Sequence, residues 1–287
     1  MARVAVVGSY GVGLTWVSAR APERGETVVG SGFHIDHGGK GSNQAVGAAR
    51  LGAEVSLLTA VGEDVFGDSA FELWREEGVD AEAVVRATLA TMAGAILVEA
   101  GGDNRIVITP GALSALEPAH VDAFAESIET ADVCLVQLEI PLPTAHRALE
   151  LARAAGVRTI LNPAPAPEEP IARELLELVD YLTPNETEAA ALGDPSAART
   201  VVLTLGADGA RVGEAHVPAY RAEPADTTGA GDAFNAALAV ALAEGRADLD
   251  AVRWGCAAGA HMVEHEGVVP GLPTRVQLEH RLLATVR

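Results

Sequence analysis

Short apolar runs, rich in β-branched residues, alternate along this chain with longer segments rich in Ala, Leu and Glu. This alternation constrains the fold more than any other feature of the sequence. The short runs are apolar at successive positions, which is typical of strands covered on both faces. Strands that alternate with helices build βαβ units. The sequence therefore predicts an α/β fold, a doubly wound and mostly parallel sheet flanked by helices.

The sequence predicts strands of a main sheet, helices between them, and two extended stretches outside this alternation. Strands of the main sheet are expected over residues 4–8, 55–60, 133–137, 159–162, 181–183 and 201–205. Helices are expected over residues 43–51, 69–77, 118–129, 143–155, 171–178, 186–192, 230–244, 249–265 and 275–284. Two extended stretches, 26–34 and 92–108, fall outside this alternation, and the turn at 99–105 suits a hairpin loop. They predict a small β-sheet beside the main one, a candidate lid.

The composition fits a protein with a large buried core and excludes several classes. Of 287 residues 49% are hydrophobic, and the formal net charge of −20 argues against a nucleic-acid-binding surface. No run reaches the roughly 18 apolar residues of a membrane-spanning helix, and the first residues enter a strand pattern with no signal peptide. Cys134 and Cys256 lie in apolar stretches. We expect a cytoplasmic protein with two reduced, buried thiols.

The glycines after the first strand do not match a dinucleotide-binding turn. Gly8, Gly11 and Gly13 follow the apolar residues of "VAVVGSYGVG" with the spacing G-x-x-G-x-G. The dinucleotide fingerprint has the spacing G-x-G-x-x-G. A phosphate-binding site is therefore expected elsewhere in the chain.

The strongest candidate for such a site is "ADTTGAGDAFNAALAVALAEG", residues 225–245. Gly229, Ala230 and Gly231 precede a strongly apolar helix, so free backbone N–H groups and the positive helix end would meet at one point. Such a point binds anions. Asp232 follows in the first turn, where it could take a proton from a hydroxyl that attacks phosphorus. The alternative is that Asp232 is only a favourable charge at a helix N-terminus.

A second glycine-rich segment, "DHGGKGSNQAVGAARLG", spans residues 36–52. Its spacing is not that of a Walker A loop. Gly38, Gly39 and Gly41 would let the backbone approach a ligand closely. Lys40 and Asn43 can form hydrogen bonds with hydroxyl groups. The alternative is a glycine-rich turn between a strand and a helix, with Asn43 near the helix cap.

Two further segments follow predicted strands. In "YLTPNETEAAALG", residues 181–193, Asn185 and Glu188 fall on one side of the first helical turn, where they could orient a hydrated Mg²⁺ and phosphates. Asn185 could equally serve only as a helix cap. The loop "TLGADGA", residues 204–210, suits a nucleotide, although a turn without a ligand explains it equally well.

One short motif points to a different chemistry. The segment "HMVEH" matches the inverted zincin pattern H-x-x-E-H, and His261 and His265 are four residues apart on a predicted helix. The sequence offers no evident third ligand, and the helix belongs to the α/β body. A zinc site is therefore the weaker reading of these residues.

Taken in chain order, the four segments 36–52, 181–193, 204–210 and 225–245 resemble the ribokinase-like (PfkB) family of carbohydrate kinases. "GGKGSNQA" resembles the first family signature and "DTTGAGDAFNAAL" the second, with "LVQLEIP", "LNPAPAP" and "TPNETEA" between them. The resemblance covers essentially the whole chain. It implies one α/β domain over residues 1–287, with lid segments at about 10–37 and 88–109, often joined into a homodimer through the lid. It also implies transfer of the ATP γ-phosphoryl group to a sugar hydroxyl with Mg²⁺.

The resemblance also assigns roles to residues of this chain. It implies that Asp232 is the general base and also contacts the substrate, and that the backbone of Gly229, Ala230 and Gly231 forms the anion hole. Sugar-contacting positions are Gly39, Lys40, Gly41, Asn43 and Glu139. Nucleotide-binding positions are Asn185, Thr204, Gly206, Asp208 and Gly209, and Glu188 holds Mg²⁺ through water. Part of a monovalent-cation (K⁺) site matches Asp226, Thr228 and Gly267, although His265 and Gly271 depart from the family pattern there.

Two departures bear on function. Family members continue "GS" with Asn-x-Asp, and this Asp binds two sugar hydroxyls, whereas this chain has Gly11 and Gly13 at those positions. A hydrogen bond to a carboxylate is worth about 1.5–3 kcal/mol, so ribose binding should weaken while space for a larger group appears. Residues 193–199 are also shorter than in the family. The sequence predicts a kinase of a sugar or sugar-like alcohol; the alternatives are a nucleoside kinase and a non-catalytic sugar- or nucleotide-responsive binding protein.

Overall fold

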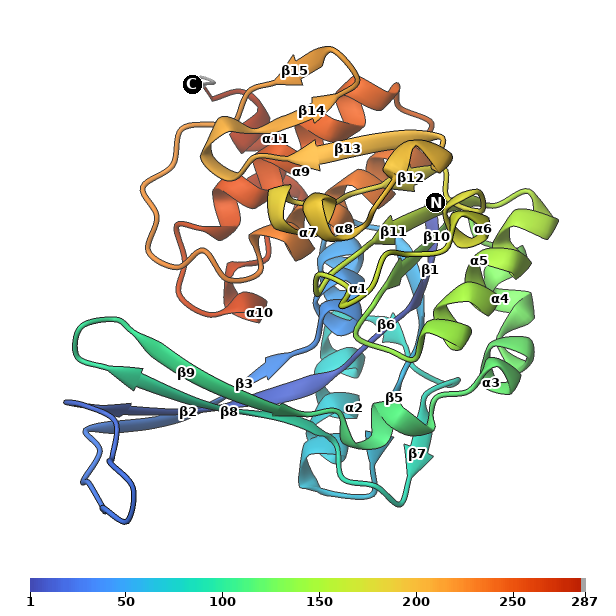
Figure 1. Cartoon of the computed structure of the whole chain (residues 1–287). Helices are drawn as coiled ribbons and strands as arrows, with labels where there is room; N and C mark the ends of the chain where they lie inside the picture. The colour runs from blue at the N-terminus through green and yellow to red at the C-terminus, as the bar shows by residue number, and fades with distance from the viewer. Residues whose placement is uncertain (285–287) are drawn as a thin grey trace.

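The computed structural model describes residues 1–284, and a mixed sheet forms the centre of this part of the chain (Figure 1). Its strands lie in the order β15-β14-β13-β12-β11-β10-β1-β4-β6. Their bounds are β1 (Arg3–Val7), β4 (Glu54–Leu58), β6 (Val79–Asp80), β10 (Val133–Gln137), β11 (Arg158–Asn162), β12 (Tyr181–Leu182), β13 (Thr200–Thr204), β14 (Ala210–Val212) and β15 (Ala215–Val217). Neighbours from β6 to β13 pair in parallel, and the β13-β14 and β14-β15 pairs are antiparallel.

Helices cover both faces of this sheet, which confirms the predicted doubly wound fold (Figure 1). One face packs against α1 (Lys40–Arg50), α2 (Val65–Glu77), α8 (Ala230–Ala243), α9 (Asp248–Met262) and α11 (Arg275–Leu282). The other packs against η1 (Gly111–Ala115), α3 (Pro118–Ala123), α4 (Ala125–Glu129), α5 (Leu142–Ala155) and α6 (Arg173–Leu176). In β1, Val4 and Val6 join the first core, whereas Ala5 and Val7 join the second. An unbroken apolar run is therefore needed to fill both cores.

A second, smaller sheet projects from one side of the molecule (Figure 1). It has the order β3-β2-β8-β9, with β2 (Gly11–Ser18), β3 (Gly32–Gly38), β8 (Met92–Glu99) and β9 (Asn104–Thr109). The predicted hairpin between β8 and β9 is confirmed. The expected extended segment 26–34 is partly wrong, because β3 begins only at Gly32 and continues to Gly38. β2 was not predicted as a strand, and β5 (Ala60–Gly62) pairs with β7 (Val85–Ala87) in a short sheet of their own.

Several predicted helix boundaries are wrong for local reasons. α1 begins at Lys40 rather than at residue 43, because Gly39, with φ +86°, is the N-cap; Asn43 lies inside the helix and not near its cap. α2 begins at Val65 rather than at 69, since the Asp64 carboxylate accepts a hydrogen bond from the backbone N–H of Gly67. The predicted helix 118–129 is divided at Phe124 into α3 and α4. α9 ends at Met262 and does not reach residue 265.

The two cysteines and the remaining helices complete the description. Burial raises the pKa of both Cys134 and Cys256 to about 12, so these thiols stay protonated at neutral pH. α7 (Glu186–Ala191) follows β12, and α10 (Val268–Gly271) contacts α1, α9 and β3. Among residues 1–284, the helices are too short or too polar to cross a membrane.

Candidate active site

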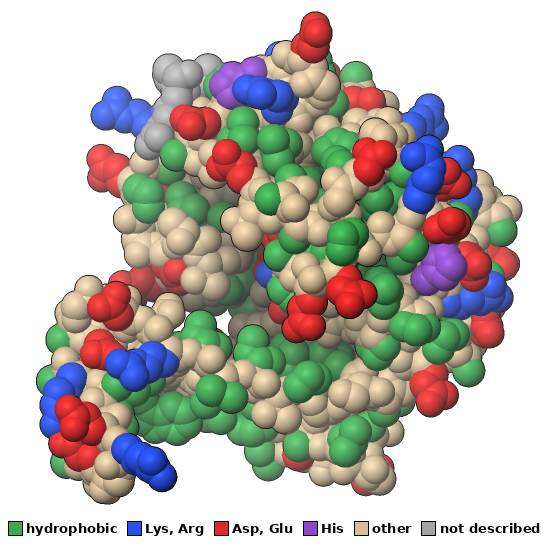
Figure 2. Space-filling view, in the orientation of Figure 1, with side chains coloured by type: hydrophobic (Ala, Val, Ile, Leu, Met, Phe, Trp, Pro, Cys, Tyr) green, Lys and Arg blue, Asp and Glu red, His purple; other side chains and the backbone are tan. Residues whose placement is uncertain are grey.

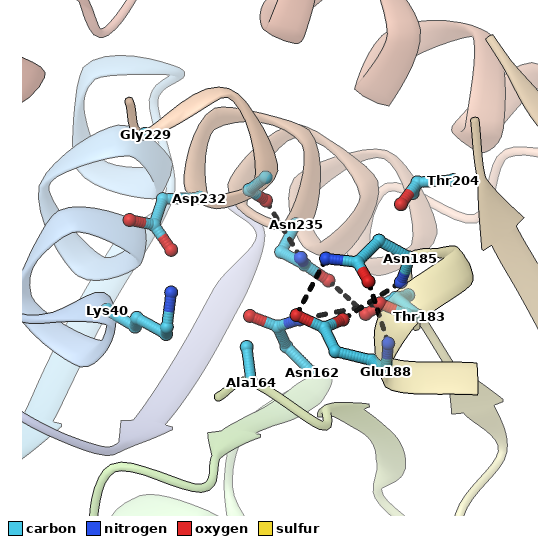
Figure 3. Close-up of a pocket in the computed structure, with 11 residues that line it drawn as sticks. Lys40, Asn162, Ala164, Thr183, Asn185, Glu188, Thr204, Gly229, Asp232 and Asn235 are labelled. Atoms are coloured by element: carbon cyan, nitrogen blue, oxygen red, sulfur yellow. Dashed lines mark hydrogen bonds between the residues drawn. The ribbon is translucent and has the colours of Figure 1, made fainter. Parts of the chain in front are cut away.

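A pocket opens where the carboxyl ends of several parallel strands meet the N-termini of α1, α7 and α8 (Figure 3). Seven of its lining residues were predicted from the sequence: Lys40, Asn185, Glu188, Thr204, Gly229, Gly231 and Asp232. Four were missed: Asn162, Ala164, Thr183 and Asn235. Residues up to 195 positions apart in the chain therefore converge, because the carboxyl ends of parallel strands lie at one edge of the sheet.

The N-terminus of α8 supplies one wall of this pocket. Gly229 is its N-cap with φ +79°, and a Cβ there would lie 2.6 Å from Val268 Cγ1, so only glycine fits. A Cβ on Gly231 would meet no atom within 4 Å, so this position faces open space. Backbone N–H groups in a first helical turn have no partners within the helix. The predicted anion site is therefore sterically accessible.

Asp232 lies in the same helical turn, and both oxygens of its buried carboxylate accept hydrogen bonds from amide groups. Asn43 Nδ2 donates to Oδ2 over 2.8 Å, and Gln44 Nε2 donates to Oδ1 over 2.9 Å. Burial raises the pKa of Asp232, while the Lys40 ammonium and the two amide donors act in the opposite direction. The amide donors favour the charged form, which is the form that can accept a proton.

The Gln44 amide is itself held in one orientation. Gln137 Nε2 donates to Gln44 Oε1 over 2.5 Å, and Gln44 Nε2 also donates to Asn162 Oδ1 over 3.0 Å. Because the Gln44 oxygen is occupied by Gln137, its NH₂ group faces Asp232. Sequence reasoning missed this network. The only signal was a second amide side chain beside Asn43 and amide residues at the ends of two strands.

Lys40 enters the pocket from the first residue of α1, and Figure 3 shows its ammonium group directed toward the Asp232 carboxylate. Burial lowers the pKa of Lys40, but the nearby carboxylates of Asp232, Glu139 and Glu188 outweigh this effect and raise it. Glu139 binds the start of this helix, because its carboxylate accepts a hydrogen bond from the Lys40 backbone N–H over 2.9 Å and another from the Ser9 hydroxyl. One ammonium group therefore lies among three carboxylates, which favours its charged form.

Two glycines bring this helix against the first strand's carboxyl end. A Cβ on Gly39 would lie 2.5 Å from Tyr10 Cα, and a Cβ on Gly41 would lie 2.5 Å from Ser9 N. Both contacts are with backbone, which cannot move aside. Lys40 is placed in the pocket because the start of α1 packs closely against the residues that follow β1.

Asn185 and Glu188 form a reciprocal cap on α7 and also line the pocket. Asn185 Oδ1 accepts from the Glu188 backbone N–H over 2.8 Å, and Glu188 Oε2 accepts from the Asn185 backbone N–H over 2.9 Å. Burial raises the pKa of Glu188, against the effects of the Asn185 N–H and Lys40. The capping alternative is therefore present in the structure, and it leaves both side chains directed into the pocket (Figure 3).

The predicted nucleotide loop lies beside them. Thr204 forms a β-bridge with Asn185, and its backbone N–H donates to the Pro184 carbonyl over 2.9 Å. Gly206 and Asp208 form a 3₁₀ turn after β13, next to the pocket but not among its lining residues. Gly209 has φ +91°, and a Cβ there would lie 2.1 Å from the Val217 carbonyl oxygen, so glycine is required by the turn into β14.

The residues matched to a monovalent-cation site also come together. The Asp226 carboxylate accepts hydrogen bonds from the backbone N–H groups of Thr228, over 2.8 Å, and Gly267, over 3.4 Å. Burial alone would raise the pKa of Asp226, but these hydrogen bonds hold it below its usual value. The two loops to which the sequence assigns this site are thus in contact in this chain.

The zinc alternative gains no support. The rings of His261 and His265 lie 4.5 Å apart, but His265 Nδ1 contacts the His261 carbonyl oxygen over 2.9 Å. Within residues 1–284 no three His, Cys, Asp or Glu side chains are grouped closely enough to hold a metal ion.

Comparison with known proteins places this geometry in a family. The family model "pfkB family carbohydrate kinase" matches residues 1–275. A ribokinase of Bacillus subtilis is 38% identical over 294 residues, which cover 98% of this chain and 100% of that protein. A deoxyribokinase of Salmonella typhi is 37% identical over 253 residues, covering 80% of this chain and 82% of that protein.

The fold comparison agrees with the sequence comparison. The structure of Arabidopsis thaliana ribokinase complexed with ribose and ATP superposes with a TM-score of 0.91 at 31% identity, covering 99% of this chain and 100% of that one. The fold and the sequence relationships agree. The chain belongs to the pfkB family of carbohydrate kinases, and it is a phosphotransferase of the sugar or nucleoside kinase class.

Proposed function

We propose that this protein transfers the γ-phosphoryl group of ATP to a hydroxyl of a sugar or sugar-like alcohol, with Asp232 as the general base. The observation that carries this proposal is the buried Asp232 carboxylate, bound by two amide donors at the N-terminus of α8. A group that only balances a helix dipole needs neither burial nor two oriented donors. The two amide donors and the Lys40 ammonium oppose the effect of burial and favour the unprotonated form that a base needs.

In this mechanism the acceptor hydroxyl lies against Asp232, which removes its proton as the oxygen attacks the γ-phosphorus. The bond from that phosphorus to the β–γ bridging oxygen breaks, and ADP leaves. The backbone N–H groups of Gly229, Ala230 and Gly231 stabilise the negative charge that develops on the transferred group. Lys40 adds a positive charge on the same side of the pocket. Asn185, Thr204 and the loop through Gly206, Asp208 and Gly209 would bind the nucleotide.

The residues present fit Mg²⁺ and a monovalent cation. Mg²⁺ is usually held by one or two carboxylates, several waters and substrate phosphates, and the Glu188 carboxylate lines the pocket opposite the helix end. When bound there, Mg²⁺ would neutralise charge on the phosphates. Asp226, Thr228 and Gly267 would place a K⁺ ion beside the anion hole. Both ions are proposals that rest on these donor groups.

A panel of acceptors tests the proposed activity. ADP release is measured with ATP and D-ribose, 2-deoxy-D-ribose, D-fructose, glycerol and inosine as separate acceptors. We expect release that depends on a sugar or sugar-like alcohol. Release with inosine alone would instead identify a nucleoside kinase, and saturable sugar binding without any ADP release would identify a binding protein on the same scaffold.

Replacing Gln44 by Leu tests how Asp232 is kept unprotonated. The substitution removes one hydrogen bond to the charged carboxylate, so the pKa of Asp232 rises above its already raised value. Because the base acts unprotonated, the acidic limb of the kcat/KM profile moves to higher pH, by roughly one pH unit. The same profile is measured for Gln277→Leu, which changes an exposed cap on α11. An unshifted limb in Gln44→Leu would contradict this role for Gln44.

We also propose that residues 1–287 form one kinase domain in which segments 10–37 and 88–109 act as a lid, and that two copies associate through it. Trp16, Phe33 and Ile35 share one face of the small sheet and are 42%, 54% and 50% exposed. The Trp16 and Phe33 rings lie 5.1 Å apart. A contiguous exposed apolar face of this kind marks an interaction site.

Sedimentation equilibrium tests this association. We expect the mass of a dimer for the unmodified protein and of a monomer for Phe33→Glu, because a charge in an apolar interface is not paired. Val29→Glu, in the exposed loop between β2 and β3, should remain a dimer. A monomeric unmodified protein would contradict the proposal.

The cytoplasmic location expected from the sequence stays a prediction.

A further inference from the structure

The alternation of side chains along β2 shows which face of the small sheet is directed toward the cleft between this sheet and the body of the molecule. Val12 is buried and Leu14 partly buried in the core that includes Trp74 of α2. Since successive side chains point to opposite faces, Gly11 and Gly13 face away from α2. That direction is toward α10, which contacts β3, and Figure 2 shows a hollow between the projecting sheet and the body of the molecule.

Across this cleft-facing surface runs a row of four residues from four strands. Gly13 of β2 pairs with Asp36 of β3 on one side and with Gly94 of β8 on the other. Gly94 pairs in turn with Ile108 of β9. Residues directly opposite in neighbouring strands share a face. The row therefore has a carboxylate at one end, an aliphatic side chain at the other, and two glycines between them.

Few atoms lie above the two glycines, and the nearest to Gly13 is the movable end of one side chain. A Cβ on Gly13 would approach only Ile96 Cδ1, at 3.3 Å, and a Cβ on Gly94 would make only ordinary contacts, the nearest with Ile108 Cγ1 at 3.8 Å. Neither glycine has a positive φ. Glycine is therefore not required at either position by the backbone, in contrast to Gly39. The absence of side chains at Gly13 and Gly94 leaves room for part of a ligand.

Asp36 is available to such a ligand. Its carboxylate contacts His34 Nε2 over 3.2 Å, on the same face of β3, and within residues 1–284 it has no Lys or Arg partner. Its side chain is 49% exposed. A carboxylate with free acceptor sites at the rim of a cleft can bind two hydroxyl groups of a polyol.

We propose that Asp36 is a specificity-determining residue whose carboxylate binds hydroxyls at the end of the acceptor remote from Asp232. This inference rests on the proposed function. Neighbouring strands lie about 4.8 Å apart, so Asp36 is one strand further toward the edge of the sheet than a carboxylate at position 13 would be. The acceptor must therefore extend farther than a pentose, and it is a sugar of hexose size or a sugar with a substituent at that end.

Calorimetric titration with D-fructose and with D-ribose, in the presence of a non-hydrolysable ATP analogue, tests the role of Asp36. We expect the unmodified protein to bind D-fructose more tightly than D-ribose. Asp36→Asn should weaken D-fructose binding at least about tenfold while the affinity for the ATP analogue is unchanged. Asp103→Asn, which removes another exposed carboxylate of the small sheet's β8–β9 hairpin, is the matched control and should bind both sugars normally.

A double variant that moves the carboxylate from position 36 to position 13 provides a second test of the proposal. Combining Gly13→Asp with Asp36→Ala moves the carboxylate one strand inward, and a small shift of the Ile96 side-chain end accommodates it. We expect this double variant to prefer D-ribose to D-fructose. Sugar affinities of Asp36→Asn within about twofold of the unmodified protein, or no binding of either sugar to the unmodified protein, would overturn the proposal. Binding that depends on Asp36 without any phosphoryl transfer would support it and contradict the proposed function alone.

Discussion

Replacing Asp232 by Asn lowers kcat by about three orders of magnitude or more, because the acceptor hydroxyl loses the group that takes its proton. The substitution keeps the shape of the side chain, and the anion site at Gly229 to Gly231 is made by backbone groups that it does not alter. The affinity for ATP should therefore stay within about twofold of the unmodified protein. Initial rates of ADP release and titration with an ATP analogue measure the two effects.

Asp194→Asn is a suitable control for this experiment. Asp194 is an exposed carboxylate that caps a short 3₁₀ helix, and it lies outside the pocket. It should retain normal turnover. A circular dichroism spectrum of Asp232→Asn shows whether the fold is intact. An intact Asp232→Asn protein with near-normal turnover is incompatible with Asp232 as the base.

Replacing Gly41 by Ala has the second largest expected effect, and it acts through the backbone. The added Cβ would lie 2.5 Å from Ser9 N and 2.6 Å from Gly8 C, so the start of α1 and the end of β1 must separate. We expect a loss of about 3 kcal/mol in the free energy of unfolding, which lowers Tm by roughly 6–12 °C. Acceptor binding should weaken as well, since Lys40 moves with the helix start.

Gly101→Ala provides the matched comparison. Gly101 lies in the turn between β8 and β9, where a Cβ would have Asp103 Oδ2 at 4.0 Å as its nearest neighbour. It should leave Tm and sugar binding nearly unchanged. Thermal unfolding followed by circular dichroism compares the two variants, and equal Tm values would show that the Gly41 backbone contact does not limit stability.

The parallel sheet and the central pocket residues were predictable from sequence because their signals are local. The run Val4 to Val7 is apolar at each position, and only a strand between two helix layers needs that pattern. Gly229 to Asp232 form the start of a strongly apolar helix, so one short segment indicates both the helix end and the acidic residue beside it. The chain order of these segments then places them at one edge of the sheet.

Features that depend on contacts between distant segments were not predictable. β2 contains Gly11 and Gly13, and glycine is a poor strand former, so this strand exists because β3 and β8 pair with it on both sides. β14 and β15 have three residues each, too few for a periodic signal. The Gln137–Gln44–Asp232 network joins three elements through side chains alone. No single segment reveals it.

The residue opposite Gly13 is the clearest example of a contact between distant segments that the sequence alone does not reveal. The sequence reveals that a carboxylate is missing from β2, but Asp36 is 23 residues away along the chain. Only the strand register places it directly opposite Gly13 on the cleft-facing side. The roles assigned to individual site residues remain predictions of the same kind, and the variants described above test them one at a time.

Phosphorus NMR of the reaction mixture distinguishes phosphoryl transfer to a sugar from hydrolysis of ATP. The unmodified protein is incubated with ATP, Mg²⁺, K⁺ and the acceptor that gives the fastest ADP release, and the phosphorus signals are followed with time. We expect a sugar phosphate ester that appears in step with ADP, and neither signal with Asp232→Asn. ADP accompanied only by inorganic phosphate, or an ester formed at an equal rate by Asp232→Asn, would contradict the proposed function.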